Sequence, residues 1–389
     1  MRFDPAITDS VELRFSKLAR AKNLAGQPII SFGLGEPDFP TPPTIIAAAE
    51  AAMRAGFTRY SDPLGLADLR QRIVEKLRAD NGIAASTDQI LVAPGAKMAL
   101  SLALGALLAP GDEVVAIAPC YPSYVPQVKI AEPEAVVKLV PVRTDTFAID
   151  LSALATAIGP RTRAVLVNSP HNPTGHMMGS NEVEGLADLL ATSGAWLLSD
   201  EVYEKLAFSG RAHISPAARS ELTARTITIN GFSKAYAMTG WRIGYLHVPD
   251  PAIMHKVSQL QQHLNTNTAP FIQKAALAAL ELPSDHLSAY NRRLAANARA
   301  LSDVVAGLQA LSLVAPDGGL FAFLDIRGTA MSSDAFATGL LEEEGVAATP
   351  GSVFGAGFDG FVRVSLAIAE DRFAEGARRL EKFTRQRIS

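Results

Sequence analysis

Three short segments in the middle of the chain carry the strongest indication of its fold: RAVLVN (163–168), AWLLSD (195–200) and TITIN (226–230). Each is a run of apolar or β-branched residues, which indicates a strand buried on both faces. Two earlier segments are of the same kind, QILVA (89–93) and DEVVAIA (112–118). Buried strands that alternate with helices predict an α/β protein with a mostly parallel sheet between helices.

Helical periodicity fills segments between these strands. Apolar residues recur three and four positions apart in two of them, at Leu66, Leu69, Ile73 and Leu77 and at Val183, Leu186 and Leu190. The longest apolar run, MALSLALGALLA (98–109), is too short to cross a bilayer and predicts a buried helix.

The pattern changes after about residue 280. A long amphipathic helix is followed there by GLFAFLDI (319–326), a helix around SSDAFATGLLEEEG (332–345), FVRVSLA (361–367) and a final helix ending in RRLEKF (378–383). This order is typical of a smaller α+β unit. We expect a large domain over 45–279, and a small domain formed by 280–389 together with an N-terminal arm over 1–44.

Composition limits the class of partner. The chain has 389 residues, 48% hydrophobic and 19% charged, with a formal net charge of −3 and no Lys- or Arg-rich block. Nucleic acid and membrane are therefore not expected as partners. The single cysteine, Cys120, allows no intrachain disulfide, and the first 15 residues have no apolar signal-peptide core. We expect a soluble, cytoplasmic protein.

Chemically distinctive residues follow each predicted strand. Parallel strands end at one edge of a sheet, where ligands bind. The residues concerned are, in chain order, Gly95, Ala96 and Lys97; Tyr121; Asn172; Asp200 and Tyr203; Ser233, Lys234 and Arg242. Singly, each fits a turn, a helix cap or a solvated loop. Together they supply an amine, a carboxylate, a phenol, an amide, a flat ring and a phosphate cradle, which suits pyridoxal 5′-phosphate and requires no metal.

Six motifs resemble class I aminotransferases of the fold-type-I pyridoxal phosphate family. They are GLGEPDFPTP (33–42), YSDPLGLADLR (60–70), SPHNPTG (169–175), SDEVYEKLAF (199–208), GFSKAYAMTGWRIGY (231–245) and FVRVSLA (361–367). They occur in the family's order from about residue 31 to 383. The resemblance implies the family's large domain, with a seven-stranded-type, mostly parallel sheet, and its smaller α+β domain.

The resemblance also implies roles around the cofactor ring. Lys234 matches the Schiff-base lysine, which also acts as general base at the substrate Cα. Asp200 matches the carboxylate that keeps the pyridine nitrogen protonated. Tyr203 and Asn172 match the residues that hydrogen-bond the phenolic oxygen, and Tyr121 matches the ring that stacks on the pyridine.

The phosphate contacts are implied in the same way. Arg242, the Ser233 hydroxyl and the N–H groups around Ala96 and Lys97 match the family's phosphate site. Tyr60 matches a tyrosine that reaches the phosphate from the neighbouring subunit, which implies a homodimer with shared active sites.

Arg363 matches the arginine that clamps the substrate α-carboxylate, a planar bidentate task. Gly35 and Asn172 are implied to lie beside the same carboxylate. The chain departs from the family at Gly231, where a serine is frequent, so one phosphate contact is in doubt. His171 stands at a variable position and receives no role.

The expected reaction is transamination from an L-amino acid to a 2-oxo acid. The alternative is carbon–sulfur β-elimination by a lyase of the same fold, although AMTGWRIG (237–244) is closer to the aminotransferase pattern. A third possibility is a non-enzymatic regulator of this family. Such proteins carry an appended DNA-binding domain, and this chain has neither the extra length nor the basic region for one. A degenerate scaffold is disfavoured because Lys234, Asp200 and both arginines are present.

The sequence gives less information about the side chain of the amino-acid substrate. Dicarboxylate specialists in part of this family use a second arginine near QQHLNTNTAP (261–270), a stretch that contains no Arg or Lys here. This disfavours strict aspartate use by that route, although Arg14, Arg20 or Arg59 could substitute. Neutral, aromatic and small aliphatic donors remain open, with 2-oxoglutarate or pyruvate as acceptor.

Overall fold

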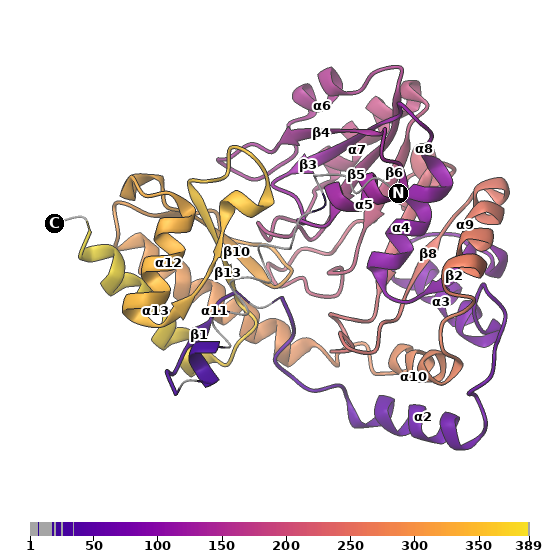
Figure 1. Ribbon diagram of the computed structural model, residues 1–389, viewed down its shortest axis with the longest axis horizontal. Coiled ribbons are helices and arrows are strands. Elements are labelled where there is room, and N and C mark those ends of the chain that lie inside the picture. Colours follow the sequence, from indigo (N-terminus) through magenta and orange to yellow (C-terminus); the bar gives the residue numbers. More distant parts are fainter. Residues whose placement is uncertain (1–6, 8–17, 19–20, 25, 34, 388–389) are drawn as a thin grey trace.

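A computed structural model of the protein describes residues 7, 18, 21–24, 26–33 and 35–387. Two arginines considered above, Arg14 and Arg20, and most of the N-terminal arm lie outside the described residues. In Figure 1 a large sheet with its helices occupies the upper right, and β10, β13 and three C-terminal helices lie at the left. The two groups pack against each other, since Phe323 of β10 and Phe361 of β13 share a hydrophobic cluster with Val115 and Val165 of the large sheet.

The central sheet has seven strands. Their order is β2 (Ile90–Ala93), β8 (Gly244–His247), β7 (Thr226–Gly231), β6 (Trp196–Asp200), β5 (Thr162–Asn168), β3 (Glu113–Ala118) and β4 (Val136–Pro141). Only β8 runs antiparallel to its neighbours, so β2 and the other five strands share one direction. The predicted seven-stranded, mostly parallel sheet is confirmed.

The five strands expected from the sequence begin and end within one residue of the observed ones. Two strands were missed, for different reasons. β4 is an edge strand with partly exposed side chains, Val136 among them, so it lacks the signature of a buried strand. β8 begins at Gly244, the next-to-last residue of the glycine-rich motif 231–245, and its four residues are too few to show a periodic pattern.

Helices cover both faces of the sheet. Successive residues of a strand point to opposite faces, so each buried strand presents apolar side chains to both layers of helices. Leu198 packs towards α4 (Ala96–Leu107), α5 (Tyr124–Ala131) and α9 (Pro251–Leu264). Its neighbour Leu197 packs on the other face. That face is covered by α6 (Leu151–Ala157), α7 (Ser180–Ser193) and α8 (Ser220–Thr223), with α3 (Ala67–Asn81) further along. Burial on both faces explains the continuous apolar runs in the sequence.

Two further helices, α2 (Pro43–Arg54) and α10 (Pro270–Leu280), pack on each other at the lower margin of Figure 1. Short 3₁₀ turns occur at Thr87–Gln89, Pro216–Ala218, Arg327–Thr329 and Gly351–Phe354. Among the described residues, no helix combines the length and the apolar character needed to span a membrane.

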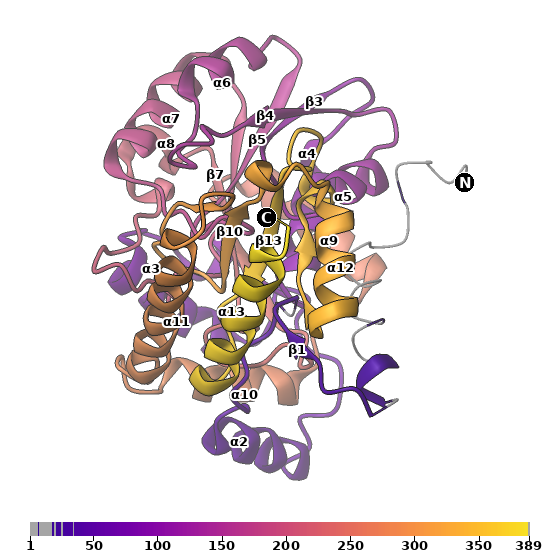
Figure 2. The same cartoon turned by 90° about the vertical axis from the view of Figure 1, so that its left-hand side faces the viewer.

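The C-terminal part forms an antiparallel sheet in the order β12 (Thr349–Pro350), β13 (Phe361–Ser365), β10 (Phe321–Asp325) and β9 (Ser312–Leu313). Helices α11 (Ser288–Ala306), α12 (Ser333–Glu344) and α13 (Glu370–Arg385) accompany it (Figure 2). The early strand β1 (Ile30–Ser31) pairs in parallel with β11 (Val346–Ala347). This pairing attaches the segment before the large sheet to the C-terminal part.

Candidate active site

The site forms at the carboxyl edge of the large sheet. Asn168 ends β5 and Asp200 ends β6, and the two residues are partners in the parallel ladder. The Asn168 side chain donates to the Asp200 carbonyl oxygen at 2.9 Å and accepts from the Asn172 N–H at 2.8 Å. Strand pairing and one asparagine therefore bring the segments carrying Asp200 and Asn172 together.

Asp200 is a buried carboxylate with one tyrosine partner. The Tyr124 hydroxyl donates to Asp200 Oδ2 at 2.7 Å, and the Val202 N–H donates to Oδ1 at 3.3 Å. Burial raises the pKa of Asp200 to about 6, although the Tyr124 hydrogen bond and the Lys234 charge act in the opposite direction. A cationic ligand beside Asp200 would relieve this cost.

Tyr124 was missed in the sequence. It stands three positions after Tyr121, at the start of α5, and its hydroxyl becomes relevant only because the helix turns it towards β6. Burial and the Asp200 charge hold the pKa of Tyr124 well above its ordinary value, so this phenol stays protonated and donates.

Lys234 lies in the turn that follows β7. Its ammonium donates to the Gly35 carbonyl oxygen at 2.5 Å and lies 5.9 Å from the centre of the Tyr203 ring. Tyr203 is only 5% exposed, so its ring forms a fixed wall. The structure thus brings the predicted lysine, phenol and glycine together from three distant segments.

Arg363 reaches this edge from the small sheet. It is fully buried on β13, and its guanidinium donates to Asn172 Oδ1 at 3.0 Å and to the Gly33 carbonyl oxygen at 3.1 Å. The guanidinium carbon lies 4.0 Å from the centre of the Phe321 ring. Such contacts hold the planar fork in one orientation.

A glycine-lined cradle surrounds the first residue of α4. Gly95 has φ +88°, and a Cβ built on it would lie 2.4 Å from Arg242 Nη2, so the guanidinium covers that backbone. A Cβ on Gly244 would lie 2.6 Å from the Ala96 nitrogen. Ser233 is buried in the turn after β7. Backbone N–H groups at a helix start with an arginine over them form an anion site.

Tyr121 and Lys97 lie beside one another, whereas Tyr60 is separate. The Tyr121 ring is edge-on to the Tyr124 ring at 5.5 Å, and the Lys97 ammonium is 5.5 Å from the Tyr121 ring centre. Tyr121 is therefore next to the partner of Asp200. Tyr60 is 87% exposed and has no contact of this kind within the described chain.

Residues 27–380 match the aminotransferase class I and II family. The chain belongs to this family. It is 37% identical to arginine–pyruvate transaminase AruH of Pseudomonas aeruginosa, over 95% of this chain and 93% of that protein. It is 36% identical to aspartate aminotransferase of Geobacillus stearothermophilus, over 98% of both chains. The crystal structure of Thermus thermophilus aspartate aminotransferase with maleate superposes with a TM-score of 0.91, at 33% identity over 97% of both chains.

The predicted enzyme class is thereby confirmed: this aminotransferase transfers an amino group between an amino acid and a 2-oxo acid. The lyase alternative is not favoured, because the curated relatives are named aminotransferases. Two of those names differ in substrate, arginine–pyruvate and aspartate, so membership of the family leaves the donor open.

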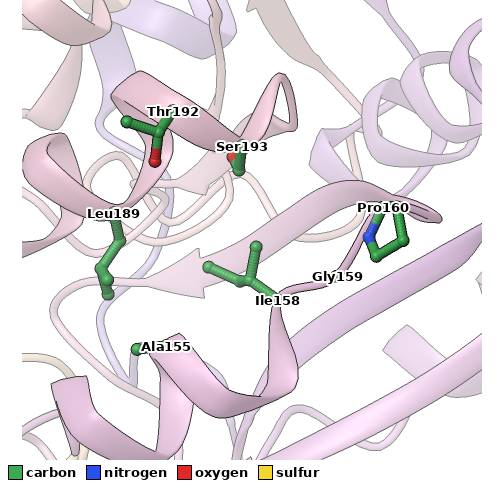
Figure 3. A pocket seen from close by; sticks show the side chains of 7 residues that line it. All are labelled: Ala155, Ile158, Gly159, Pro160, Leu189, Thr192 and Ser193. Carbon is green, nitrogen blue, oxygen red and sulfur yellow. The ribbon is translucent and has the colours of Figure 1, made fainter.

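A surface hollow of about 330 Å³ lies away from the aminotransferase site. Figure 3 shows it between the ends of α6 and α7 and the turn that precedes β5, lined by Ala155, Ile158, Gly159, Pro160, Leu189, Thr192 and Ser193. That turn is at the amino end of β5, opposite the edge that carries Asp200. The lining offers no titratable group, so catalysis is assigned to the other edge.

Proposed function

We propose that this aminotransferase binds pyridoxal 5′-phosphate at the carboxyl edge of its large sheet, with Lys234 as the reacting amine. The observation that carries the proposal is the combination of a desolvated Asp200 carboxylate and a half-buried Lys234 with a separate glycine-lined anion cradle. The residues present fit the group: the cradle suits a phosphate, and a buried carboxylate with a raised pKa suits a protonated ring nitrogen.

When bound, pyridoxal phosphate supplies an aldehyde that captures amines and a ring that withdraws electrons from the substrate. Asp200, oriented by Tyr124, holds the proton at the ring nitrogen. Tyr203 and Asn172 donate towards the phenolic oxygen, and Tyr121 covers one ring face. The phosphate is held by Arg242, Ser233 and the N–H groups of Ala96 and Lys97.

Lys234 moves the proton at the substrate Cα, because it is the amine nearest Gly35 and Tyr203 in the described site. Arg363 binds the α-carboxylate through its two terminal nitrogens, with Asn172 and the Gly35 backbone beside it. When a substrate carboxylate binds the Arg363 guanidinium, it replaces the neutral acceptors Asn172 Oδ1 and the Gly33 carbonyl oxygen. Hydrogen bonds to a charged acceptor are stronger than those to a neutral one.

A labelling experiment tests the proposed cofactor and its lysine. After incubation with pyridoxal phosphate and reduction with borohydride, peptide mass spectrometry is expected to find the added mass on Lys234 alone. Lys97 serves as the internal control, since it lies close to the Tyr121 ring but on the exposed start of α4. A label on Lys97 instead, or on no lysine, would contradict the assignment.

Gly231 offers a test of the phosphate contacts. A Cβ there would meet the Ala96 Cβ and the Ile243 carbonyl oxygen at 3.5 Å, which is ordinary contact, so a side chain fits. We expect Gly231→Ser to tighten cofactor binding about tenfold, because one hydrogen bond to a charged group adds about 1.5 kcal/mol net. Equilibrium dialysis of the apo-protein measures this, with Gly231→Ala as matched control. Equal affinities of the two variants would show that the hydroxyl does not reach the phosphate.

We infer a homodimer in which Tyr60 reaches the phosphate site of the partner. The support is the motif position of Tyr60 and its 87% exposure. Further apolar side chains are partly exposed nearby, namely Ile46, Met53 and Phe57. An isologous dimer would cover them.

Subunit mixing tests the shared site. Tyr60→Ala and Lys234→Ala proteins, each inactive alone, are mixed under conditions of subunit exchange. A mixed dimer then has one intact and one doubly altered site, so an equal mixture should recover about a quarter of wild-type activity. No recovery despite exchange, or a fully active monomer, would place Tyr60 outside the neighbouring site.

We propose that the large domain spans 45–279 and that 280–389 forms the small domain with the N-terminal arm. The separate antiparallel sheet and the pairing of β1 with β11 support this division.

We also propose a cytoplasmic location, which fits the one buried cysteine, Cys120.

For the substrate we propose a donor other than a strict dicarboxylate. Gln261 and Thr268 lie in the stretch without Arg or Lys, and their side chains bind the Val92 carbonyl oxygen at 3.2 and 3.1 Å. They are thus committed to the fold of their own chain. A screen of single amino acids for loss of the visible cofactor band identifies the donor. Bleaching by aspartate or glutamate alone would contradict this choice.

A further inference from the structure

A buried ionic cluster lies behind the proposed cofactor site. Glu201, the residue directly after Asp200, is fully buried. Its carboxylate accepts four hydrogen bonds, from Ser199 Oγ at 2.8 Å, Ser215 Oγ at 2.7 Å, Asn81 Nδ2 at 3.0 Å and His213 Nε2 at 3.1 Å. Donors from α3, β6 and the segment after β6 therefore converge on one anion. We call these residues, with Lys76 and Glu204, the Glu201 cluster.

The second carboxylate of the cluster is Glu204. It is 9% exposed, and it receives the Lys76 ammonium in an ion pair and the Asn81 amide in a hydrogen bond. Asn81 thus binds Glu201 and Glu204 at once. The cluster thus holds one ammonium for two carboxylates, and the His213 ring lies 3.1 Å from Glu201 Oε2.

None of these side chains is among the proposed cofactor contacts, yet the cluster borders them in the chain. Asp200 and Glu201 are consecutive, and their side chains diverge: Asp200 meets Tyr124 from α5, whereas Glu201 meets Asn81 from α3 on the other face. Tyr203 lies 5.9 Å from the Lys234 ammonium by its ring centre, whereas Glu204 meets Lys76 and Asn81 of α3. Asp200 and Tyr203 are therefore each followed by a carboxylate that is anchored on α3.

Burying such charges is expensive, and hydrophobic residues of similar size would often be as stable. Their presence directly behind Asp200 and Tyr203 suggests a role at the site. We propose that Glu201 is a positioning residue for the cofactor. Its anchored charge makes the electrostatic potential around Asp200 more negative. The inference rests on the proposed pyridoxal phosphate site.

The charges around both groups support this role. The negative charge of Glu201 raises the pKa of Asp200, in addition to the larger effect of burial. It also opposes the burial that lowers the pKa of His247 on β8 to about 4. The titratable groups that surround the pair are Tyr124, Tyr203 and Lys234 towards the cofactor, and Lys76, Asp80, Glu204, His213, Tyr245 and His247 towards the cluster.

The test follows the visible absorption of the bound cofactor against pH, without substrate. A buried negative charge favours protonated forms nearby, so removing it lowers the pH at which they lose the proton. Glu201→Gln keeps the size and most hydrogen bonds of the side chain. We expect this variant to lower the pH midpoint of the absorption change by on the order of one pH unit. A shift of this size corresponds to the interaction energy with one unit charge at an effective dielectric constant of about 20. Glu204→Gln should shift it in the same direction.

Two variants separate charge from structure. Ser215→Ala removes one hydrogen bond to Glu201 and keeps the charge, so its midpoint should equal that of the wild type. Lys76→Met/Glu204→Gln removes the ion pair without changing net charge and should also leave the midpoint in place. Retained far-ultraviolet circular dichroism checks the fold of each variant, and Glu204→Gln replaces Glu201→Gln if the latter fails to fold.

An unshifted midpoint in folded Glu201→Gln or Glu204→Gln protein would overturn the inference. An equal shift in Ser215→Ala would overturn it too, because structure rather than charge would then be responsible. Both results would leave a visible wild-type band and hence the proposed function intact. A wild-type protein that gives no such band with pyridoxal phosphate would instead contradict the proposed function itself, and the inference with it.

Discussion

Replacing Lys234 by alanine is expected to slow amino-group transfer about 10²- to 10⁴-fold, the usual contribution of a positioned acid–base group. The variant should still bind pyridoxal phosphate without a covalent bond, because the cradle of Gly95, Gly244 and Arg242 and the Asp200 carboxylate remain. The physical reason for the loss is that the described site places this amine beside Gly35 and Tyr203. Rapid mixing of the variant with amino acid, followed at the cofactor band, measures the single-turnover rate.

Two further lysine variants sharpen this prediction. Lys234→Arg keeps the positive charge but cannot release a proton at neutral pH, so it should be as slow as the alanine variant. Lys256→Ala removes an exposed lysine on α9 and should react at the wild-type rate. A Lys234→Arg protein within tenfold of the wild type would assign the proton transfer to another group.

Asp200→Asn is expected to reduce turnover and to stabilise the cofactor-free protein at the same time. Turnover should fall about 10²- to 10³-fold, the typical cost of losing one charge aimed at the reacting system. The stability effect has the opposite sign. The folded protein raises the pKa of Asp200 from 3.8 to about 6, so it binds this proton more tightly than the unfolded chain does. Above pH 6 the buried charge therefore costs stability, and asparagine removes that cost.

The expected gain follows from the two pKa values. A shift of roughly two units corresponds to about 3 kcal/mol in the free energy of unfolding, present above about pH 6 and absent below about pH 4. Urea unfolding of cofactor-free protein at pH 8 and pH 4.5 measures it, and the wild type is the reference at each pH. A variant that is less stable than the wild type at pH 8 would show that Asp200 carries no such buried charge. A variant that is equally active in single turnover would show that this charge is not needed at the ring nitrogen.

The strands and most of the site residues were predictable from local sequence. A strand buried on both faces leaves a continuous apolar run, and in a parallel sheet the residue after each run is directed to the same edge. That is why the positions of Asp200, at the end of β6, and Lys234, in the turn after β7, were predictable. β4 was not found, because an exposed edge strand has no comparable pattern.

Other parts of the site depended on contacts that no local pattern reports. Tyr124 became the partner of Asp200 because α5 packs on the face of the sheet to which that carboxylate points. Arg363 meets Asn172 across 191 positions of sequence, through the packing of the small sheet on the large one. Glu201 read as one of three acidic residues in SDEVYE (199–204), and its burial shows only in the fold.

The sequence by itself therefore determined the five buried strands of the large sheet and, through the resemblance of its motifs, the enzyme family, because continuous apolar runs and motif residues each lie within one segment. The tertiary structure alone decided which side chains are buried against which partners. Desolvation and hydrogen bonding depend on atoms brought from distant segments, so the pKa of Asp200, the orientation of Arg363 and the anchoring of Glu201 exist only once the chain has folded.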